Sequence, residues 1–109
     1  MKAAKRRKLE AKGWKIGSAA DFLELSEEDA AYVELKLKLA SCLKDTRTQH
    51  RLTQKQLAER INTSQSRVAK METGDRSVSI DLLIRSLLAL GVTNKRIGEI
   101  ITKPLNHAA

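Results

Sequence analysis

The strongest hydrophobic pattern in the chain runs from about Ser26 to His50. From Val33 to Leu39 apolar and charged residues alternate strictly, which taken alone is typical of a β-strand. A helix is favoured because Ser26 and Asp29 form a capping pattern, and because the segment consists mostly of good helix formers. On a helix its apolar residues form two stripes, Leu35, Leu39 and Leu43 in one and Val33, Leu37 and Ala40 in the other. We therefore predict a long helix that is covered on two sides.

Start and stop signals predict four shorter helices after this one. Thr53 and Gln56 have the spacing of a capping box, and Asn62 suits the left-handed turn at the end of that helix. The next helix is capped by Thr63 or Ser64 and stopped by Gly74. The boundaries that we predict for the four helices are 53–60, 64–73, 80–90 and 94–102, with Pro104 after the last.

The N-terminal region has a different pattern. Residues 1–13 are basic and lack periodicity, so we expect an arm there. A brief helix is expected over 19–25, and its few apolar residues, together with Trp14 and Ile16, are expected to attach the arm to the body. We thus divide the chain into an arm with a short helix (1–25), a helical domain (26–103) and a tail (104–109).

Composition limits the class of protein. A chain of 109 residues is long enough for one domain, and 41% hydrophobic residues allow a packed core. The single Cys42 excludes an internal disulfide and fits a reducing compartment. No apolar run is long enough for a membrane span, and no apolar region follows the basic start as in a secretory signal. We expect an all-α, cytoplasmic protein.

Charge is distributed in blocks along the chain. Residues 1–15 hold seven bases and one acid, whereas 21–34 hold six acids and no base. Residues 47–76 hold seven bases and three acids, a net of +4 within a chain total of +8. The basic blocks favour a nucleic-acid partner over other partners, although an ordinary basic surface would have the same composition. The acidic block would be repelled by DNA and points to a separate role.

The helices over 53–60 and 64–73 have the spacing of a helix-turn-helix unit, which holds its second helix out for the major groove of DNA. Ala58 is small where the helices approach, and the wedge between them is expected to come from Leu57, Ile61, Val68 and Met71, with Ser64 also facing inward. The opposite face carries groups that suit base edges, namely Gln65, Ser66 and Lys70, with Arg67 at its flank.

These residues resemble the Xre/Cro/C1 helix-turn-helix family of phage repressors. The resemblance rests on positions that agree in type and spacing: Arg47, Leu52, Thr53, Gln54, Leu57, Ala58, Ile61, Thr63, Ser64, Gln65, Val68, Met71, Glu72 and Gly74. It implies a five-helix fold like that of the lambda repressor. The sequence departs from the pattern twice, because Asn62 and Arg51 replace common glycines.

The resemblance also implies roles for individual residues. Gln65 and Ser66 match the leading base-reading positions, Lys70 a later one, and Arg67 a position that touches base or phosphate. Gln54 matches a phosphate-binding glutamine at the start of its helix, and Arg47 and Glu72 match an internal ion pair. The full set of phosphate contacts that we expect is Thr53, Gln54, Ser64 and Arg76.

A second resemblance concerns the segment from Arg7 to Ser18, followed by Phe22–Leu23 and by Ser26–Glu28. These residues are similar to the lead-in of HigA-type antitoxins. Those proteins neutralise a RelE/HigB-like toxin and repress their shared promoter. The acids that would contact such a basic toxin are Asp21, Glu24, Glu27, Glu28 and Asp29, although the last three also favour a helix N-terminus.

The function that we predict is sequence-specific repression by a homodimer on double-stranded DNA, with autoregulation of its own operon and an antitoxin role. The alternatives are a regulator without a toxin partner and a toxin-neutralising protein with weak DNA binding. No phosphate loop, activated nucleophile or metal-ligand spacing is evident, so we expect no enzyme activity and no cofactor. Ile97, Ile100 and Ile101 could be core, and we favour them as a dimer seam.

Overall fold

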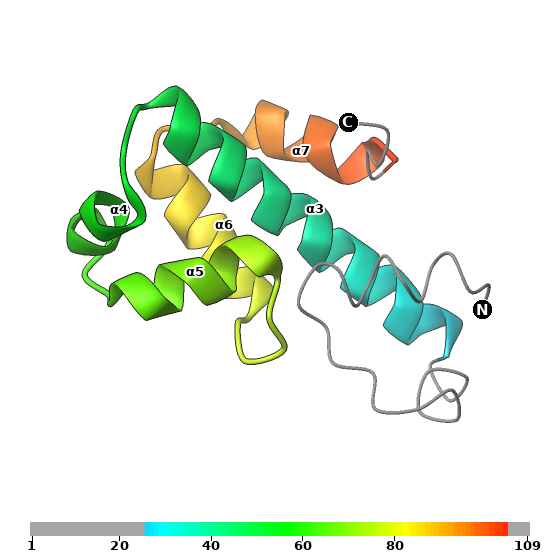
Figure 1. The fold of residues 1–109 in the computed structure, drawn as a ribbon. Coiled ribbons are helices and arrows are strands. Elements are labelled where there is room, and N and C mark those ends of the chain that lie inside the picture. Colours follow the sequence, from blue (N-terminus) through cyan, green and yellow to red (C-terminus); the bar gives the residue numbers. More distant parts are fainter. Residues whose placement is uncertain (1–25, 105–109) are drawn as a thin grey trace.

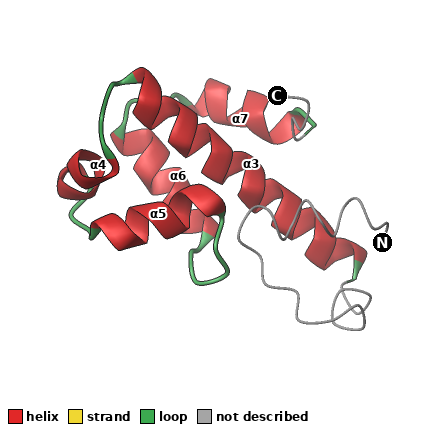
Figure 2. Cartoon of the chain, viewed as in Figure 1, coloured by secondary structure: helices red, strands yellow, loops and turns green. Residues whose placement is uncertain are grey.

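The computed structural model describes residues 26–104, and these fold into helices joined by short turns (Figures 1 and 2). The helices are α3 (Glu27–Gln49), α4 (Gln54–Arg60), α5 (Gln65–Thr73), α6 (Ile80–Ala89) and α7 (Asn94–Thr102). Within the described residues no strand is present, so the predicted all-α class is confirmed. The predicted arm, the short helix over 19–25 with Asp21 and Glu24, and residues 105–109 lie outside the described part.

Helix α3 is the central element of the fold. It begins at Ser26, whose hydroxyl accepts a hydrogen bond from the Asp29 N–H (3.0 Å), and continues through the alternating segment without interruption. The rejection of a strand there was correct. Both predicted stripes are occupied, because α3 contacts α5, α6 and α7. In the first stripe Leu39 and Leu43 are buried and Leu35 is half-buried. All three residues of the second stripe, Val33, Leu37 and Ala40, are buried.

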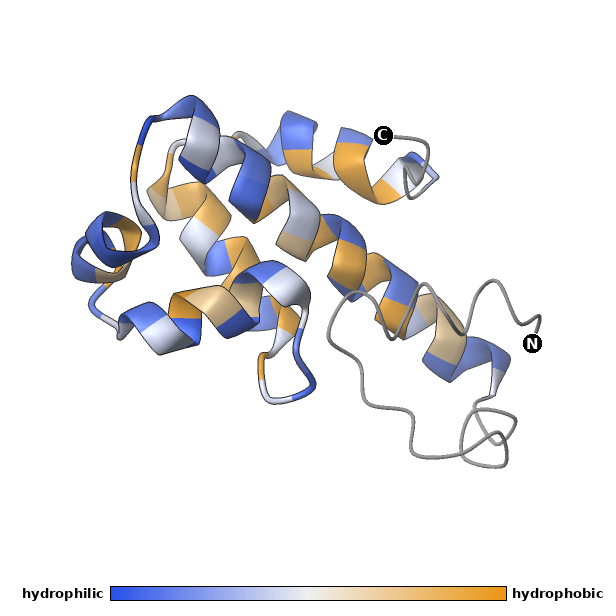
Figure 3. Ribbon diagram, in the orientation of Figure 1, coloured by the Kyte–Doolittle hydropathy of each residue, from blue (hydrophilic) through white to orange (hydrophobic). Residues whose placement is uncertain are grey.

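The core lies between the C-terminal half of α3 and the four shorter helices. Aliphatic residues and one methionine dominate it, as expected for a chain with only 3% aromatic residues. Figure 3 shows the apolar colour concentrated on the inward sides of α3, α5 and α6. The fully buried side chains with the largest volumes are Leu37, Leu39, Leu43, Leu57, Met71, Leu83 and Leu87. Each such residue stabilises the fold by about 1.5–3 kcal/mol relative to an exposed position.

The N-terminal half of α3 has a different environment. Figure 1 shows this half extending beyond α5, α6 and α7, which lie beside the rest of the helix. Ala30 and Val33 on this half are nevertheless buried, at 6% and 3% exposure. Neither residue belongs to the main core cluster, whose first member along the chain is Leu39.

Helix α7 packs its apolar side onto the body of the domain. Ile97 is 8% exposed and belongs to the core cluster, and Ile100 packs against that cluster. The preference for Ile97 as part of a dimer seam was therefore wrong, because this side chain is already buried within one copy. Ile101, at 37% exposure, remains on the surface. No helix among residues 26–104 has the length and apolar character needed to cross a membrane.

Candidate DNA-binding interface

Helix α4 begins with a complete capping box. The Gln56 N–H donates to the Thr53 hydroxyl (3.0 Å), and the Thr53 N–H donates to the Gln56 side-chain carbonyl (2.8 Å). Such a cap is worth about 1 kcal/mol and fixes where a short helix begins. Because α4 has 7 residues, its position depends on this cap and on the burial of Leu57 and Ala58.

The turn between α4 and α5 is tight. Asn62 has φ of 59°, the left-handed conformation that a helix end requires and that asparagine tolerates better than most residues. The next N–H, that of Thr63, donates to the Ala58 carbonyl (2.8 Å) and closes the turn. Ala58 is 3% exposed, so a larger side chain has no room there. The turn thus holds α5 at a fixed angle to α4.

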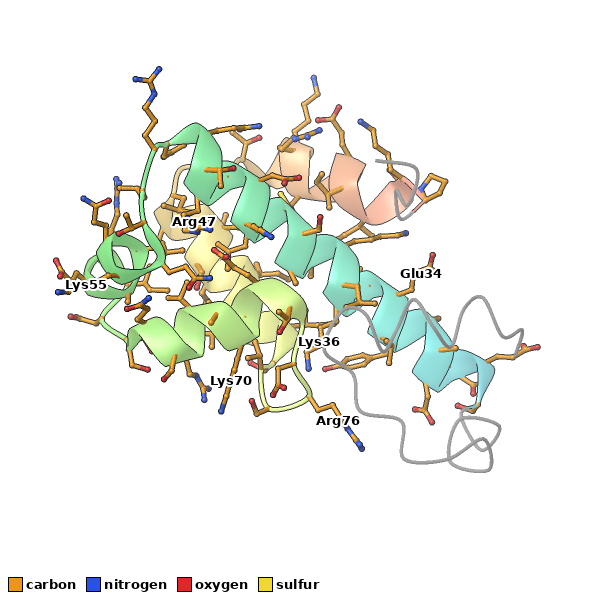
Figure 4. All side chains as sticks on the ribbon, viewed as in Figure 1. Glu34, Lys36, Arg47, Lys55, Lys70 and Arg76 are labelled. Carbon is orange, nitrogen blue, oxygen red and sulfur yellow. The ribbon has the colours of Figure 1, made fainter. Side chains whose placement is uncertain are left out.

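Helix α5 has two distinct faces. Val68 and Met71 are 0% exposed and pack between α4, α3 and the rest of the core. The predicted base-reading residues are all exposed, namely Gln65, Ser66, Arg67 and Lys70. Figure 4 shows Lys70 projecting from α5 away from the bundle. Amide, hydroxyl, guanidinium and ammonium groups on one helix face match the donors and acceptors of base edges in the major groove.

Ser64 is the N-cap of α5 and is exposed rather than turned inward as the sequence suggested. Its hydroxyl accepts from the Arg67 N–H (3.1 Å) and lies 3.2 Å from the Ser66 hydroxyl. A capping hydroxyl accepts its hydrogen bond from the backbone at the helix start, so it does not need to face the core. Thr53 has the same arrangement at the start of α4 and is exposed too.

A buried network joins α3, α4 and α5. Arg47 on α3 donates from Nε and Nη2 to the carboxylate of Glu72 on α5, and the Nη2–Oε1 distance is 3.1 Å. Arg47 also donates to the Leu52 carbonyl (2.8 Å), at the loop that leads into α4. Gln54 is a third member of the network that the sequence did not indicate, since its side-chain amide donates to Glu72 Oε1 (3.1 Å). Glu72 thereby orients the first residue of α4.

Arg51, in the loop before α4, also has a left-handed backbone, with φ of 56°. This conformation costs roughly 1–2 kcal/mol for a residue that is neither glycine nor asparagine. The cost explains why a glycine is common at this position in the family that the sequence resembles. The Arg51 side chain is exposed, so it adds a positive charge close to the start of α4.

The turn after α5 carries Arg76. Gly74 ends the helix with φ of 69°, and a Cβ there would lie 2.8 Å from Leu37 Cδ2, so only glycine fits. Asp75 then accepts hydrogen bonds from the hydroxyl and the N–H of Ser77, and these two bonds hold the pKa of the Asp75 carboxyl below its usual value. The folded turn leaves the Arg76 side chain exposed, and Figure 4 shows it projecting outward.

The three described acids that were predicted to contact a toxin lie apart from the exposed side of α5. Glu27, Glu28 and Asp29 are exposed in the first turn of α3, where their negative charges interact favourably with the positive end of the helix dipole. Figure 1 shows this end of α3 extending away from α4 and α5. The structure therefore separates an acidic end from the side that carries Lys70. Among residues 26–104, no group of three His, Cys, Asp or Glu residues could hold a metal ion.

Comparison with known proteins agrees with this geometry. A family model described as helix-turn-helix matches residues 43–99, which is more than half of the chain and includes α4, α5 and their turn. Searches of the curated proteins and of the solved structures found no match. Members of the matched family share a fold that is typical of DNA-binding regulators, and they are generally not enzymes. The chain therefore belongs to the Cro/C1-type helix-turn-helix family of DNA-binding regulators.

Proposed function

We propose that this protein is a sequence-specific transcriptional repressor that inserts α5 into the major groove of its operator. The observation that carries the proposal is the contrast between the two faces of α5: one is fully buried, and the other presents Gln65, Ser66, Arg67 and Lys70 to solvent. Glutamine suits adenine, lysine and arginine suit guanine, and serine suits either base. A helix held by one face and polar on the other is what groove insertion requires.

Phosphate contacts would come from the edges of the same unit. Thr53 and Ser64 expose the starts of α4 and α5, and Arg76 extends from the turn after α5. Gln54 is half-buried and its amide donates to Glu72, so it would offer phosphate an amide that is already oriented. These contacts fix the register of a protein on DNA and carry no sequence information themselves.

We further propose that the repressor acts in the cytoplasm as a homodimer on its own promoter. Two recognition helices about one helical turn apart, roughly 34 Å, would bind an operator with inverted half-sites. Exposed apolar residues in the C-terminal half, Leu88 at 46% and Ile101 at 37%, support a contact between copies better than Ile97 does.

Sequence-specific binding can be tested by selecting bound duplexes from a random DNA pool at near-physiological salt. The expected result is an enriched inverted repeat with half-site centres about 10 bp apart. Gln65→Ala and Lys70→Ala should then each weaken operator binding by about 1–3 kcal/mol and binding to random DNA much less. A pool without any enriched sequence, combined with a steep salt dependence, would instead identify a non-specific binder.

An antitoxin role is the second proposal, and the exposed Glu27, Glu28 and Asp29 support it. A basic toxin would be attracted to this acidic end, which lies away from the side that carries Lys70. The test is co-purification with the small basic product of an adjacent gene. Reversing the three charges should weaken the complex, whereas Glu99→Lys, an exposed acid on α7, should not. Equal binding by both variants would exclude the acidic end from the interface.

A further inference from the structure

A groove lies between the N-terminal half of α3 and the turn that joins α5 to α6. On α3 it is lined by Asp29, Tyr32, Val33 and Lys36, which follow the spacing of one helix face. The opposite wall is formed by residues 76–79. Its volume is about 490 Å³, which is enough for several side chains. The groove has an apolar floor, because Val33 and Val78 are 3% and 1% exposed.

The described helices do not account for the burial of residues on the N-terminal half of α3. Ala30 and Val33 are as buried as core residues, yet the core cluster begins only at Leu39. Of the described helices, α5, α6 and α7 make the main contacts with α3, and Figure 1 shows the first turns of α3 extending beyond them. Tyr32, on the groove wall, is 48% exposed, so this stripe presents an aromatic ring to an incoming partner.

The groove is also positively charged at its deep end. Lys36 is 2% exposed, and its ammonium donates to the Arg76 carbonyl (3.4 Å). Burial lowers the pKa of Lys36 and the neighbouring Arg76 lowers it further, while Asp75 opposes both effects. A further carboxylate beside the ammonium would stabilise its charged form in the same way that Asp75 does. Arg76 adds a second cation at the rim. Asp29, the one acid among the described residues that line the groove, lies near the start of α3.

We propose that residues 14–25 of this same chain dock along this face. Phe22 and Leu23 would cover Ala30 and Val33, and Trp14 would enter the groove against Tyr32. Asp21 and Glu24 would then lie near the cations Lys36 and Arg76. The segment has the chemistry that the groove requires, since it contains the only tryptophan and the only phenylalanine of the chain together with two acids.

The segment is long enough and starts in the right place. Residue 25 directly precedes Ser26, the cap of α3, so the chain need only turn back along the helix. Ten residues of helix separate Ser26 from Lys36, which is about 15 Å. Twelve residues, 14–25, can span up to about 40 Å when extended, and a helical portion still leaves ample reach.

Docking would affect DNA binding, a consequence that rests on the proposed function. Arg76 serves both as a wall of the groove and as the expected phosphate contact. Docked carboxylates near Arg76 would compete with DNA phosphate for the guanidinium. The N-terminal segment would then lower the affinity of the domain for DNA until something displaces it.

Trp14 is the only tryptophan and therefore reports directly on docking in the full chain without DNA. We expect a blue-shifted emission and acrylamide quenching several-fold weaker than that of N-acetyltryptophanamide. Tyr32→Ala should shift the docking equilibrium about fivefold toward the open form, the effect of losing one aromatic pair. Arg76→Glu should also increase quenching. Thermal melting of each variant confirms that the domain remains folded.

The chain offers matched controls. Lys95→Ala truncates an exposed side chain on α7, and Arg85→Glu reverses an exposed charge on α6. Neither should change Trp14 quenching. Docking is overturned if Trp14 is as accessible as the free compound in the unchanged protein, or if the groove variants behave like these controls. Saturating operator DNA should expose Trp14, and a Trp14 that stays protected would overturn the competition with phosphate while leaving docking supported.

Discussion

The two faces of α5 differ in what fixes their residues. On the inner face Val68 and Met71 are fully buried and Glu72 bonds to two other helices, so each side chain is determined by its neighbours. On the outer face Gln65 and Lys70 are exposed, and no packing constrains their identity. One helix can therefore keep its place in the fold while its outer residues change to suit a different operator.

The largest effect is expected on the inner face. Glu72→Ala leaves Arg47 buried without its carboxylate, and the side chains in this pair are only 3% and 13% exposed. Removing one partner of such a pair costs about 3–5 kcal/mol in unfolding free energy. Urea denaturation at neutral pH measures the loss.

The exposed pair Asp81–Arg85 is the matched control for this prediction. Its side chains are 74% and 77% exposed, so Asp81→Ala should cost no more than about 0.5 kcal/mol. Similar losses for Glu72→Ala and Asp81→Ala would mean that the inner network contributes no more than an ordinary surface pair.

The outer face should show the opposite behaviour. Lys70→Ala should leave the free energy of unfolding within about 0.5 kcal/mol of its original value, because the side chain is exposed. It should nevertheless weaken operator binding by about 1–3 kcal/mol. Denaturation and DNA titration on the same preparation separate the two quantities. A stability loss that equals the binding loss would contradict the division of α5 into a structural face and a reading face.

A smaller effect is expected at the loop before α4. Arg51→Gly removes the left-handed strain at φ of 56° but increases the freedom of the unfolded chain, so stability should rise by about 0.5–1 kcal/mol. Arg85→Gly, in the interior of α6, should instead lower it by about 1 kcal/mol. Should Arg51→Gly also weaken DNA binding, the arginine would be a phosphate contact that is retained despite its strain.

The smallest effect concerns the turn after α5. Because hydrogen bonds from Ser77 lower the pKa of Asp75, its carboxylate contributes stability above the unfolded value near 3.8 and loses it as the pH falls through the folded value. Asp75→Asn should therefore be less stable than the original protein at pH 7, with the difference shrinking below about pH 4. Denaturant unfolding of both proteins across this range provides the test. A difference that persists unchanged at acidic pH would show that the charge of Asp75 is not involved.

Local signals were sufficient to predict most of the described fold. Each helix of the described region begins at a serine or threonine whose hydroxyl caps it, and such residues can be recognised from the sequence alone. The buried faces of α3 and α5 followed from helical spacing in the same way. Asn62 was correctly assigned to the turn because few other residues adopt its backbone conformation.

Contacts between distant residues could not be predicted in this way. The bond from Gln54 to Glu72 joins positions 18 apart, and the groove around Lys36 depends on a residue 40 positions away. Ile97 has the same spacing and character whether it faces a core or another copy, so the pattern alone could not decide between them. Ser64 was assigned inward from periodicity, although capping places it at the exposed helix start.

The central place of α3 has a consequence for how the chain is made. Among the described helices α3 is synthesised before α5 to α7, which pack against it, and Ile97 is the last buried residue of the described core cluster. At a synthesis rate of roughly 5–20 residues per second, several seconds pass between the synthesis of α3 and that of Ile97. Both apolar stripes of α3 are exposed during this time. Exposed apolar surface of this kind attracts chaperones and proteases. We therefore expect the rate of translation between Gln49 and Ile97 to affect how much of the protein a cell accumulates.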